Sequence, residues 1–456
     1  MNDKMSFKQL PLKKALISSL EEMKFSSLTP IQEKALPFIL DQKDLIAQAK
    51  TGSGKTFAFG LGILSFIGVS AFQTQALILC PTRELADQVA TDLRQLGRKI
   101  ENLKIATLTG GGFEERQKKS IEHGVHIVVG TPGRVLKFLK KGVLNGLSFQ
   151  YFVLDEADRM LDMGFKESIE DIVSHLSKKR QSLLFSATYP EKIQSLSKNI
   201  LKDPEFIKVD AFHNVGVIDQ RFVKVENHKE KEPVLFSYLE TLGEKTCLIF
   251  CKTKQICKSL SSSIVKKGHE ALAIHGDLNQ KERSLVLTKF SNGSSRLLVA
   301  TDVAARGLDI DKLDVVLNYD IPQDKDVYTH RIGRTGRATL KGEAVTLFID
   351  REKDFFDICG KGEITNPEDL AKDKDKVIPP EMKTFVIAAG KKQKLRKTDI
   401  LGALVKDVGI EGSDVGKIDL LDHVSYVGVK AECFNHVLTR LKGRMIKGKR
   451  RRVSEV

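Results

Sequence analysis

An eight-residue stretch near the amino terminus has the residue types and spacing of a phosphate-binding loop. It reads Ala49-Lys50-Thr51-Gly52-Ser53-Gly54-Lys55-Thr56 and lies between an apolar run and an expected helix over residues 57–66. Glycines let backbone N–H groups close around phosphate oxygens, and the helix directs its positive end at the anion. Lys55 should reach the β- and γ-phosphates, and the Thr56 hydroxyl should hold Mg²⁺. Taken alone, the stretch also fits a glycine-rich turn in an ordinary βα unit.

A second candidate site follows the apolar run Tyr151-Phe152-Val153-Leu154, which delivers Asp155-Glu156-Ala157-Asp158. An apolar strand that ends in carboxylates is costly unless the charges meet a cation. In a phosphate-loop ATPase, this is where Mg²⁺ is held and water is activated. We therefore expect Asp155 near the metal and Glu156 as the general base; the alternative is a solvated acidic turn.

Gln32 is a candidate for recognition of a base. It lies in Thr29-Pro30-Ile31-Gln32, where Thr29 can cap a helix that Pro30 opens. A side-chain amide offers a donor and an acceptor, which suits an adenine edge. Phe7 lies upstream and could stack on that base. A capped helix without a binding role is the alternative.

Several strand ends combine glycine, hydroxyl and arginine side chains, a combination that suits a nucleic-acid phosphate backbone. They are Pro81-Thr82-Arg83-Glu84-Leu85-Ala86, Gly110-Gly111-Gly112, Thr131-Pro132-Gly133-Arg134, Gln280-Lys281-Glu282-Arg283 and the segment from Ala300 to Asp309. Ligands of parallel-sheet proteins bind at the carboxyl ends of strands. Judged singly, the turns of the first half are more simply explained as βα turns.

A cluster of arginines occurs late in the second half, in His330-Arg331-Ile332-Gly333-Arg334-Thr335-Gly336-Arg337. Guanidinium groups that repel one another gather in this way when an anion lies between them. In phosphoryl transfer, such an arginine stabilises the charge on the γ-phosphate. A solvated basic turn is the alternative.

The composition favours a folded chain with a polyanionic partner. The 456 residues carry a net charge of +15 with a pI near 9.3, which suggests nucleic acid before membrane. No apolar run is long enough to span a membrane, and the first residues have no signal-peptide core, so we expect a cytoplasmic protein. Six scattered cysteines without a Cys-x-x-Cys pair predict free thiols.

Alternating strands and helices predict two α/β domains with doubly wound parallel sheets, at residues 1–210 and 217–362, and linkers at 211–216 and 363–380. Strands are expected near residues 45–47, 76–80, 105–108, 126–130, 151–154, 181–185, 246–251, 270–275, 296–301 and 314–319. Residues 381–456 have the βαββαβ order of an RNA-recognition fold, with helices at 399–407 and 433–441 and a last strand that begins at Met445.

The predicted third domain lacks the aromatic signature that stacks bases, because Tyr426 alone is available in the third strand. Basic residues are dense instead. One cluster contains Lys391, Lys392, Lys394, Arg396 and Lys397, and another contains Lys442, Arg444, Lys447, Lys449, Arg450, Arg451 and Arg452. A solvated basic tail is possible, but two clusters that flank a compact fold favour RNA contact.

These motifs occur in the order found in the DEAD-box RNA helicases, and the resemblance covers about residues 5–350. The segments Gly390-Lys391-Lys392-Gln393-Lys394-Leu395-Arg396 and Asp399-Ile400-Leu401-Gly402-Ala403-Leu404 are similar to the RNA-binding domain of DbpA-type helicases. The family pattern is relaxed at Lys24, commonly Gly, and at Leu28, commonly Pro. The resemblance implies two tandem RecA-like domains and an RRM-like third domain.

The resemblance also implies a role for each matching residue. Phe7 and Phe25 would pack around adenine, Gln32 would read it, and Ala49 to Thr56 would hold ATP and Mg²⁺. Asp155 would coordinate Mg²⁺ through water and Glu156 would activate the attacking water. Gly307 and Asp309 would touch the nucleotide, and Arg334 and Arg337 would act as arginine fingers. Ser186 and Thr188, with Asp158 and His330, would couple the nucleotide site to RNA. The RNA backbone would be held by Arg83, Gly111, Thr131, Arg134, Arg283 and Thr301.

The resulting hypothesis is a monomeric RNA-dependent ATPase that closes and opens as a two-domain clamp and unwinds short duplexes. The DbpA-type domain implies large-subunit ribosomal RNA as target and a pre-ribosomal particle as partner, in a bacterium. Three alternatives stay open: a general RNA helicase or RNA chaperone in RNA decay or cold response, an RNA-binding scaffold with a vestigial ATPase, and a DNA translocase.

Overall fold

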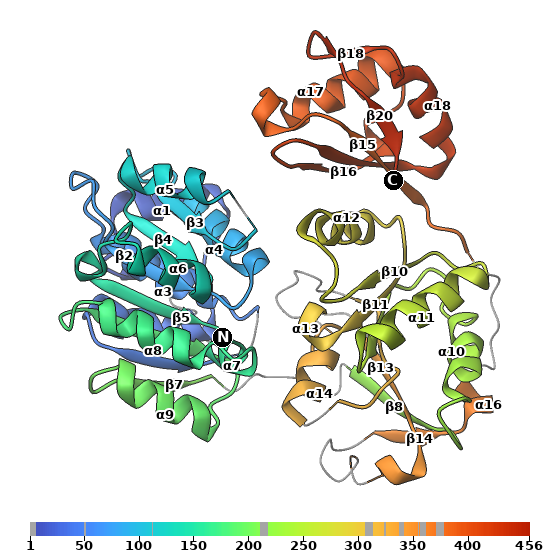
Figure 1. The fold of residues 1–456 in the computed structure, drawn as a ribbon, viewed down its shortest axis with the longest axis horizontal. Coiled ribbons are helices and arrows are strands. Elements are labelled where there is room, and N and C mark those ends of the chain that lie inside the picture. The colour runs from blue at the N-terminus through green and yellow to red at the C-terminus, as the bar shows by residue number, and fades with distance from the viewer. Residues whose placement is uncertain are drawn as a thin grey trace. The chain divides into compact units, whose positions relative to one another are not determined.

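The computed structural model describes residues 6–49, 52–111, 113–209, 218–305, 313–322, 325–336, 342–353, 355, 362–370 and 378–456 (Figure 1). The chain divides into two compact units, Met1–Phe212 and His213–Val456.

The first unit is built on a seven-stranded parallel sheet with the order β3-β4-β2-β5-β6-β1-β7. Its strands are β1 (Leu45–Gln48), β2 (Ala76–Leu79), β3 (Ile105–Leu108), β4 (Ile127–Gly130), β5 (Tyr151–Asp155), β6 (Gln181–Ser186) and β7 (Glu205–Lys208). Its helices are α1 (Lys14–Glu22), α2 (Pro30–Leu40), α3 (Lys55–Phe66), α4 (Arg83–Leu96), α5 (Glu114–Glu122), α6 (Pro132–Lys140), α7 (Ala157–Asp162), α8 (Lys166–His175) and α9 (Glu191–Ile200), with 3₁₀ turns η1 (Phe7–Gln9) and η2 (Gly146–Ser148).

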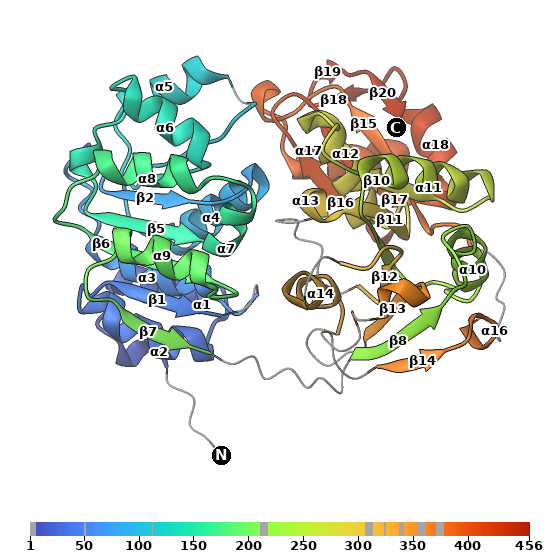
Figure 2. The same cartoon turned by 60° about the horizontal axis from the view of Figure 1, so that its bottom comes forward.

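Helices cover both faces of this sheet (Figures 1 and 2). Helices α1–α4 pack on one face in a core that includes Leu16 and Phe59, and α6–α9 pack on the other face in a core that includes Phe138 and Met160. Every residue of β2 and β4 is buried, because both faces of a central parallel strand meet helices. The doubly wound sheet predicted from the apolar runs is therefore confirmed.

The second unit contains another seven-stranded parallel sheet, with the order β10-β11-β9-β12-β13-β8-β14. Its strands are β8 (Ile218–Lys224), β9 (Cys247–Cys251), β10 (Ala271–Ile274), β11 (Leu297–Thr301), β12 (Val315–Asn318), β13 (Gly342–Phe348) and β14 (Glu363–Thr365). Its helices are α10 (Lys231–Leu239), α11 (Lys254–Lys266), α12 (Gln280–Ser291), α13 (Asp302–Ala305), α14 (Lys325–Ile332) and α16 (Pro367–Leu370), with the 3₁₀ turn η4 (Asp350–Glu352). Helices α10 and α11 pack on one face of this sheet, and α12, α13 and α14 contribute to cores on the other.

The rest of the second unit is an antiparallel sheet with the order β16-β17-β15-β20. Its elements are β15 (Met382–Ile387), η5 (Lys391–Gln393), α17 (Lys397–Gly402), a π-helical continuation η6 (Ala403–Val408), η7 (Gly412–Asp414), β16 (Val415–Leu420), β17 (Ser425–Lys430), α18 (Ala431–Leu441) and β20 (Val453–Glu455). Strands β18 (Met445–Ile446) and β19 (Lys449–Arg450) form a separate hairpin. We call residues 378–456 the C-terminal domain.

The outer face of the antiparallel sheet packs against α12 (Figure 2). Thr288 Oγ1 donates to Asp419 Oδ2 at 3.1 Å, and the hydroxyls of Ser294 and Thr384 lie 2.7 Å apart. RNA-recognition folds stack bases on this face. Tyr426 is 7% exposed there, so the one aromatic side chain available in the predicted third strand is covered.

Three sequence predictions need correction. Residues 363–370 are not linker, because β14 pairs with β8 and Leu370 is buried in the core beside α10. The strand at Met445 is not the last strand of the main sheet; β20 takes that place beside β15. The helix expected over 399–407 begins two residues earlier and ends in π-helical turns.

Two further observations concern the described residues. None of their helices is both long and apolar enough to cross a membrane. Cys80, Cys247, Cys251, Cys257 and Cys433 are free thiols, and Cys359 lies outside the described residues.

Candidate functional site

The strand order of the first sheet sorts the predicted residues into two groups along its carboxyl edge. The segments that follow β1, β5 and β6 belong to the predicted nucleotide site, and the order β5-β6-β1 makes these strands neighbours. The segments that follow β2, β3 and β4 carry the predicted nucleic-acid contacts, and β3-β4-β2 are neighbours as well. Since parallel strands end at the same edge, each group is gathered from distant parts of the sequence.

The phosphate-binding loop joins β1 to α3, as its composition predicts. Gly52 and Gly54 have φ angles of +77° and +94°, which disfavour any residue with a Cβ. Lys55 Nζ is buried and donates to the carbonyl of Ala49 at 2.8 Å. The Ser53 hydroxyl is buried without a hydrogen-bond partner among the described residues. Lys50 and Thr51 lie outside those residues.

Asp155 and Glu156 lie at the end of β5, where both are buried. Burial raises the pKa of the Asp155 carboxyl to about 7, although the nearby Lys55 ammonium acts to lower it. Asp155 Oδ1 has no hydrogen-bond partner within the described structure. A buried carboxylate oxygen and a hydroxyl in this neighbourhood are hard oxygen donors of the kind that Mg²⁺ prefers. The residues present therefore fit a magnesium–nucleotide complex.

Glu156 has left-handed backbone angles, with φ of +56° and ψ of +53°. A non-glycine residue in this region stores strain, and such strain gathers at functional sites. Its carboxylate forms an ion pair with Arg159, one turn along α7. The backbone thus turns sharply at the residue that we expect to act as general base.

Asp158 ties the end of β5 to the end of β6. Its Oδ2 accepts hydrogen bonds from the backbone N–H of Ala187 at 3.1 Å and of Thr188 at 2.9 Å, and from the Thr188 hydroxyl at 3.0 Å. Its own N–H donates to Ser186 Oγ at 3.2 Å. The structure thus brings together three of the four residues that we expect to couple the sites. The fourth, His330, is exposed on α14 in the other unit.

Gln32 holds the phosphate-binding loop as well as the start of its own helix. Its Oε1 accepts from the N–H of Thr29 at 2.9 Å, and its Nε2 donates to the carbonyl of Gly54 at 3.1 Å. Phe25 is 44% exposed and packs on Phe57 with a ring-centroid distance of 5.0 Å. Phe7 is 3% exposed within the first core, so its ring has no free face for stacking on a base. That expectation for Phe7 is not supported.

Arg83 and Gly111 meet at the ends of β2 and β3. Gly111 has a φ of +73°, and a Cβ built on it would lie 2.0 Å from Arg83 Nη1. The left-handed φ therefore favours glycine where the loop approaches the guanidinium. Arg83 is partly exposed, as contact with an external phosphate requires.

Thr131 and Arg134 lie beside the loop after β3, and Gln117 connects Arg134 to that loop. Thr131 precedes α6, and its N–H donates to the carbonyl of Leu108 at 3.0 Å. Gln117 Nε2 donates to the carbonyl of Thr109 at 3.0 Å, while its Oε1 accepts from Arg134 Nη1 at 2.9 Å. Sequence reasoning missed Gln117, because an amide on a polar helix carries no signal of its own.

In the second unit, Thr301 ends β11 at the carboxyl edge of the sheet, whereas the carbonyl of Arg334 accepts from the N–H of Leu313, just before β12. Arg283 Nη2 donates to the carbonyl of Ala304 at 2.7 Å, which ties α12 to the segment that follows Thr301. Arg334 is 7% exposed, and its N–H donates to the carbonyl of Arg331 at 3.2 Å. Gly307, Asp309 and Arg337 lie outside the described residues.

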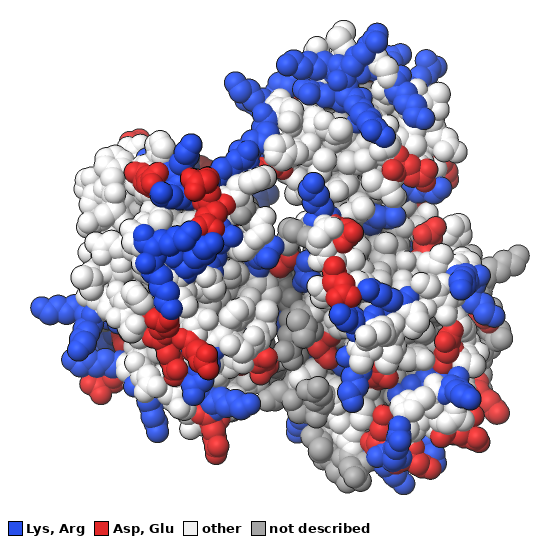
Figure 3. Space-filling view, viewed as in Figure 1, with Lys and Arg blue, Asp and Glu red and all other residues white. Residues whose placement is uncertain are grey.

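The C-terminal domain unites the two basic clusters into one surface. Lys447, on the turn of the β18–β19 hairpin, donates to the carbonyl of Lys394 and lies 2.9 Å from Asp399 Oδ2. In Figure 3, blue side chains gather over the part of this domain where Figure 1 labels α17 and β18. We define the C-terminal basic patch as Lys391, Lys392, Lys394, Arg396, Lys447 and Lys449, all of which are exposed.

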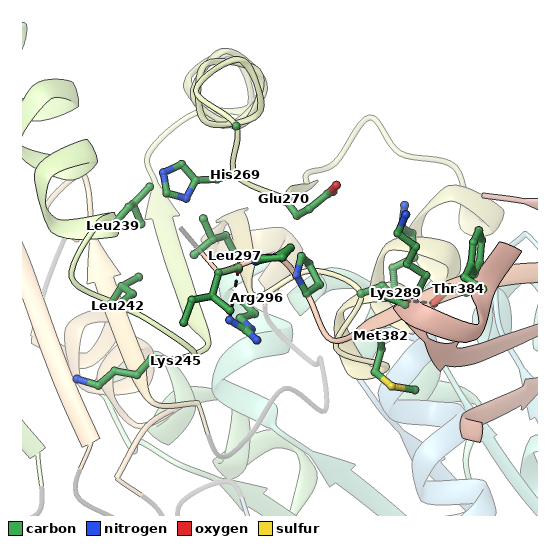
Figure 4. Close-up of a pocket in the computed structure, with 18 of the residues that line it drawn as sticks. Leu239, Leu242, Lys245, His269, Glu270, Lys289, Arg296, Leu297, Met382 and Thr384 are labelled. Atoms are coloured by element: carbon green, nitrogen blue, oxygen red, sulfur yellow. Dashed lines mark hydrogen bonds between the residues drawn. The ribbon is translucent and has the colours of Figure 1, made fainter. Parts of the chain in front are cut away.

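A cavity of 510 Å³ lies elsewhere, between the second parallel sheet and the C-terminal domain (Figure 4). Leu242, His269 and Leu297 line one side, and Met382 and Thr384 line the other. Leu297 opens β11, so the cavity lies at the amino edge of the sheet, opposite Thr301. Thr301, which ends β11, is not among the residues that line the cavity.

The first unit has a phosphate-binding loop beside strand ends that carry the predicted nucleic-acid contacts, and the second unit adds another parallel sheet and a helix that bears arginines. This combination is typical of nucleic-acid-dependent nucleoside triphosphatases. Family models match three parts of the chain: "DEAD/DEAH box helicase" at residues 29–196, "Helicase conserved C-terminal domain" at 230–339 and "DbpA RNA binding domain" at 384–455.

Curated relatives match nearly the whole chain. ATP-dependent RNA helicase DbpA of Escherichia coli is 44% identical over 442 residues, which cover 96% of each chain. DbpA of Bacillus subtilis is 36% identical over 98% of this chain and 99% of its own. The structure of S. cerevisiae Dbp5 bound to RNA and ADP BeF3 has a TM-score of 0.71 and 33% identity, and covers 80% of this chain and 96% of that one. The chain belongs to the DEAD-box ATP-dependent RNA helicases of the DbpA type, and it is an RNA-binding ATPase with two RecA-like domains.

Proposed function

We propose that ATP and Mg²⁺ bind at the carboxyl ends of β1, β5 and β6, with the roles expected from the sequence. The loop from Ala49 to Thr56 holds the phosphates, while Phe25 and Gln32 face the adenine. When bound, Mg²⁺ neutralises phosphate charge beside Thr56 and Asp155. Glu156 orients and deprotonates the attacking water. The buried oxygens of Ser53 and Asp155 support this assignment.

From the second unit, Gly307 and Asp309 touch the nucleotide, and Arg334 and Arg337 stabilise the charge that develops on the γ-phosphate. The RNA backbone is held by Arg83, Gly111, Thr131 and Arg134 of the first unit and by Arg283 and Thr301 of the second. Asp158, Ser186, Thr188 and His330 link the two functions. Contact with sugar and phosphate alone makes this edge insensitive to sequence. ATP and RNA together favour a closed clamp that loosens a short duplex, and hydrolysis reopens it.

The C-terminal domain directs the enzyme to large-subunit ribosomal RNA within a pre-ribosomal particle, in the assembly of the 50S subunit. The observation that carries this proposal is the C-terminal basic patch, in which clusters far apart in sequence share one surface while the sheet face lies against α12. We further propose a cytoplasmic monomer with domains at residues 1–210, 217–370 and 381–456, in which the second domain extends beyond residue 362 to include β14 and α16.

The test compares RNA binding by two variants with equal loss of charge. In the patch variant, Lys391, Lys392, Lys394 and Arg396 become serine. In the matched control, the exposed Lys178, Lys179, Lys192 and Lys198 of the first unit become serine. Fluorescence anisotropy measures the affinity for a structured large-subunit ribosomal RNA fragment and for an unstructured RNA of equal length.

We expect the patch variant to lose at least about tenfold in affinity for the fragment, with a salt dependence that falls by about one unit per lost phosphate contact. The control should keep its preference for the fragment. Equal weakening by both variants would leave a general RNA helicase or RNA chaperone as the better assignment.

A further inference from the structure

A buried lysine lies close to the carboxyl edge of the second parallel sheet and has no role in the function proposed above. Lys231 opens α10 and is 1% exposed. Lysine is almost never fully buried unless it is paired, and a cation at a helix amino terminus opposes the helix dipole. Because burial and the helix dipole both disfavour the charged ammonium of Lys231, nearby negative charges must stabilise it.

Two carboxylates compensate for the Lys231 ammonium. Its Nζ lies 3.7 Å from Asp320 Oδ1 and 3.6 Å from Glu352 Oε2, and it makes no hydrogen bond within the described residues. The Tyr319 ring centroid lies 6.0 Å from the same nitrogen. The lysine therefore acts on Asp320 and Glu352 chiefly through its charge, in an enclosed site where charges interact strongly.

Asp320 connects this buried charge to two segments of the sheet edge. Its Oδ2 accepts a hydrogen bond from the N–H of Lys252 at 2.9 Å, at the turn between β9 and α11. Its backbone carbonyl accepts from Arg331 Nη1 at 2.7 Å. The position of Asp320 therefore sets the positions of a loop and of a side chain on α14.

Arg331 continues this network toward the arginine that we expect at the nucleotide. Its Nε and Nη2 donate to the two carboxylate oxygens of Asp302, each at 2.7 Å. Arg331 is 2% exposed, and its carbonyl accepts from the N–H of Arg334. A shift of Asp320 would therefore move Arg331, and through Arg331 it would move the backbone of Arg334.

We infer that Lys231 is a positioning residue for ATP hydrolysis. Its buried charge holds Asp320 in place, and Asp320 in turn orients Arg331 and, through it, Arg334. The inference rests on the proposed role of Arg334 at the γ-phosphate. Lys231 touches neither nucleotide nor RNA, so its loss should lower kcat and leave the KM for ATP nearly unchanged.

The test uses the full chain with saturating RNA and measures kcat and KM for ATP together with thermal unfolding. The variants are Lys231→Met and the double variant Lys231→Met/Asp320→Asn, which also removes the facing charge. The matched control is Glu343→Gln, because Glu343 is a half-buried carboxylate between Lys245 and Arg221 at the opposite edge of the same sheet.

We expect Lys231→Met to lower kcat by about 10- to 100-fold, since a misplaced positioning group has effects of this size, with a KM within about threefold of the parent. The double variant should regain thermal stability but not kcat. Glu343→Gln should keep its kcat. If Lys231→Met does not fold, the double variant decides the question by its kcat alone.

Two results would overturn the inference: a kcat for Lys231→Met equal to that of Glu343→Gln, or a kcat that recovers together with stability in the double variant. Either result would mean that Lys231 contributes to stability and has no role in positioning Arg334. If RNA fails to stimulate the parent chain, the proposed function itself is wrong, and this outcome is distinguished by the parent measurement alone.

Discussion

Asp158 shows how a single carboxylate can join two catalytic segments. It is 8% exposed, and one of its oxygens accepts three hydrogen bonds from Ala187 and Thr188. Hydrogen bonds to a charged acceptor are stronger than those between neutral groups. The end of β6 is therefore held rigidly against the end of β5, next to Glu156.

Asp158→Asn should destabilise the first unit, because the neutral amide oxygen accepts weaker hydrogen bonds and the NH₂ group cannot accept the Arg159 N–H, which donates to Asp158 Oδ1 at 2.9 Å. We expect the free energy of unfolding to fall by about 2–3 kcal/mol, measured as a shift of the urea transition of this unit. Glu122→Gln is the control, since Glu122 forms only an exposed pair with Lys118 at 3.8 Å and should change stability by less than about 0.5 kcal/mol. Equal shifts for both variants would remove Asp158 as a link between the strands.

At the scale of elements, strand order gathers the predicted nucleotide residues and the predicted RNA contacts at two groups of neighbouring strand ends. The loop after β3 approaches Arg83 closely, since a Cβ built on Gly111 would lie 2.0 Å from Arg83 Nη1. Gly54 lies close to Gln32 in the same way, since a Cβ built on Gly54 would lie 2.5 Å from Gln32 Nε2. The φ angles of +94° at Gly54 and +73° at Gly111 favour glycine at both positions, and both lie in segments that we propose as binding sites.

Gly111→Ala should weaken RNA binding without a direct effect on ATP. Alanine at this positive φ costs about 1–3 kcal/mol. Relief of that strain would displace the loop, and an equal loss of binding free energy would raise the RNA concentration needed for half-maximal stimulation of ATP hydrolysis by about 5- to 150-fold. Gly68→Ala is the control, since its Cβ would make only an ordinary contact with Gln75 at 3.7 Å. An unchanged RNA requirement for Gly111→Ala would remove this loop from the RNA site.

Elements with a strong local signal could be predicted from the sequence. Ala76–Leu79 and Cys247–Cys251 are apolar throughout because helices cover both faces of these strands. Strand β14 could not be predicted, because Glu363-Ile364-Thr365 is recognisable only through its pairing with β8. Short edge strands owe their structure to a partner that is distant in sequence.

The candidate site shows the same distinction. Lys55, Asp155 and Glu156 could be placed from the sequence because chemistry dictates their types and spacing. The burial of Phe7 could not be predicted, since an aromatic residue before a helix can pack in the core or stack on a base. Gln117 and Lys231 act through neighbours that only the folded chain brings close.

For the whole molecule, the central claim is that RNA bound at one group of strand ends drives ATP hydrolysis at another. Both units contain a seven-stranded parallel sheet, and in each of them predicted functional segments follow the carboxyl ends of strands. The C-terminal domain contributes a basic surface and packs against α12 of its own unit. An RNA-binding scaffold with a vestigial ATPase would carry the same surface, so catalysis rather than binding separates the two accounts.

The most direct measurement is the rate of ATP hydrolysis by the full chain without RNA, with unstructured RNA and with a structured large-subunit ribosomal RNA fragment. DNA of equal length and the Glu156→Gln variant serve as controls. The account predicts stimulation by RNA and not by DNA, strongest with the ribosomal fragment, and a loss of about 10²–10⁴-fold in Glu156→Gln. Hydrolysis that no RNA stimulates, or that persists in Glu156→Gln, would contradict it.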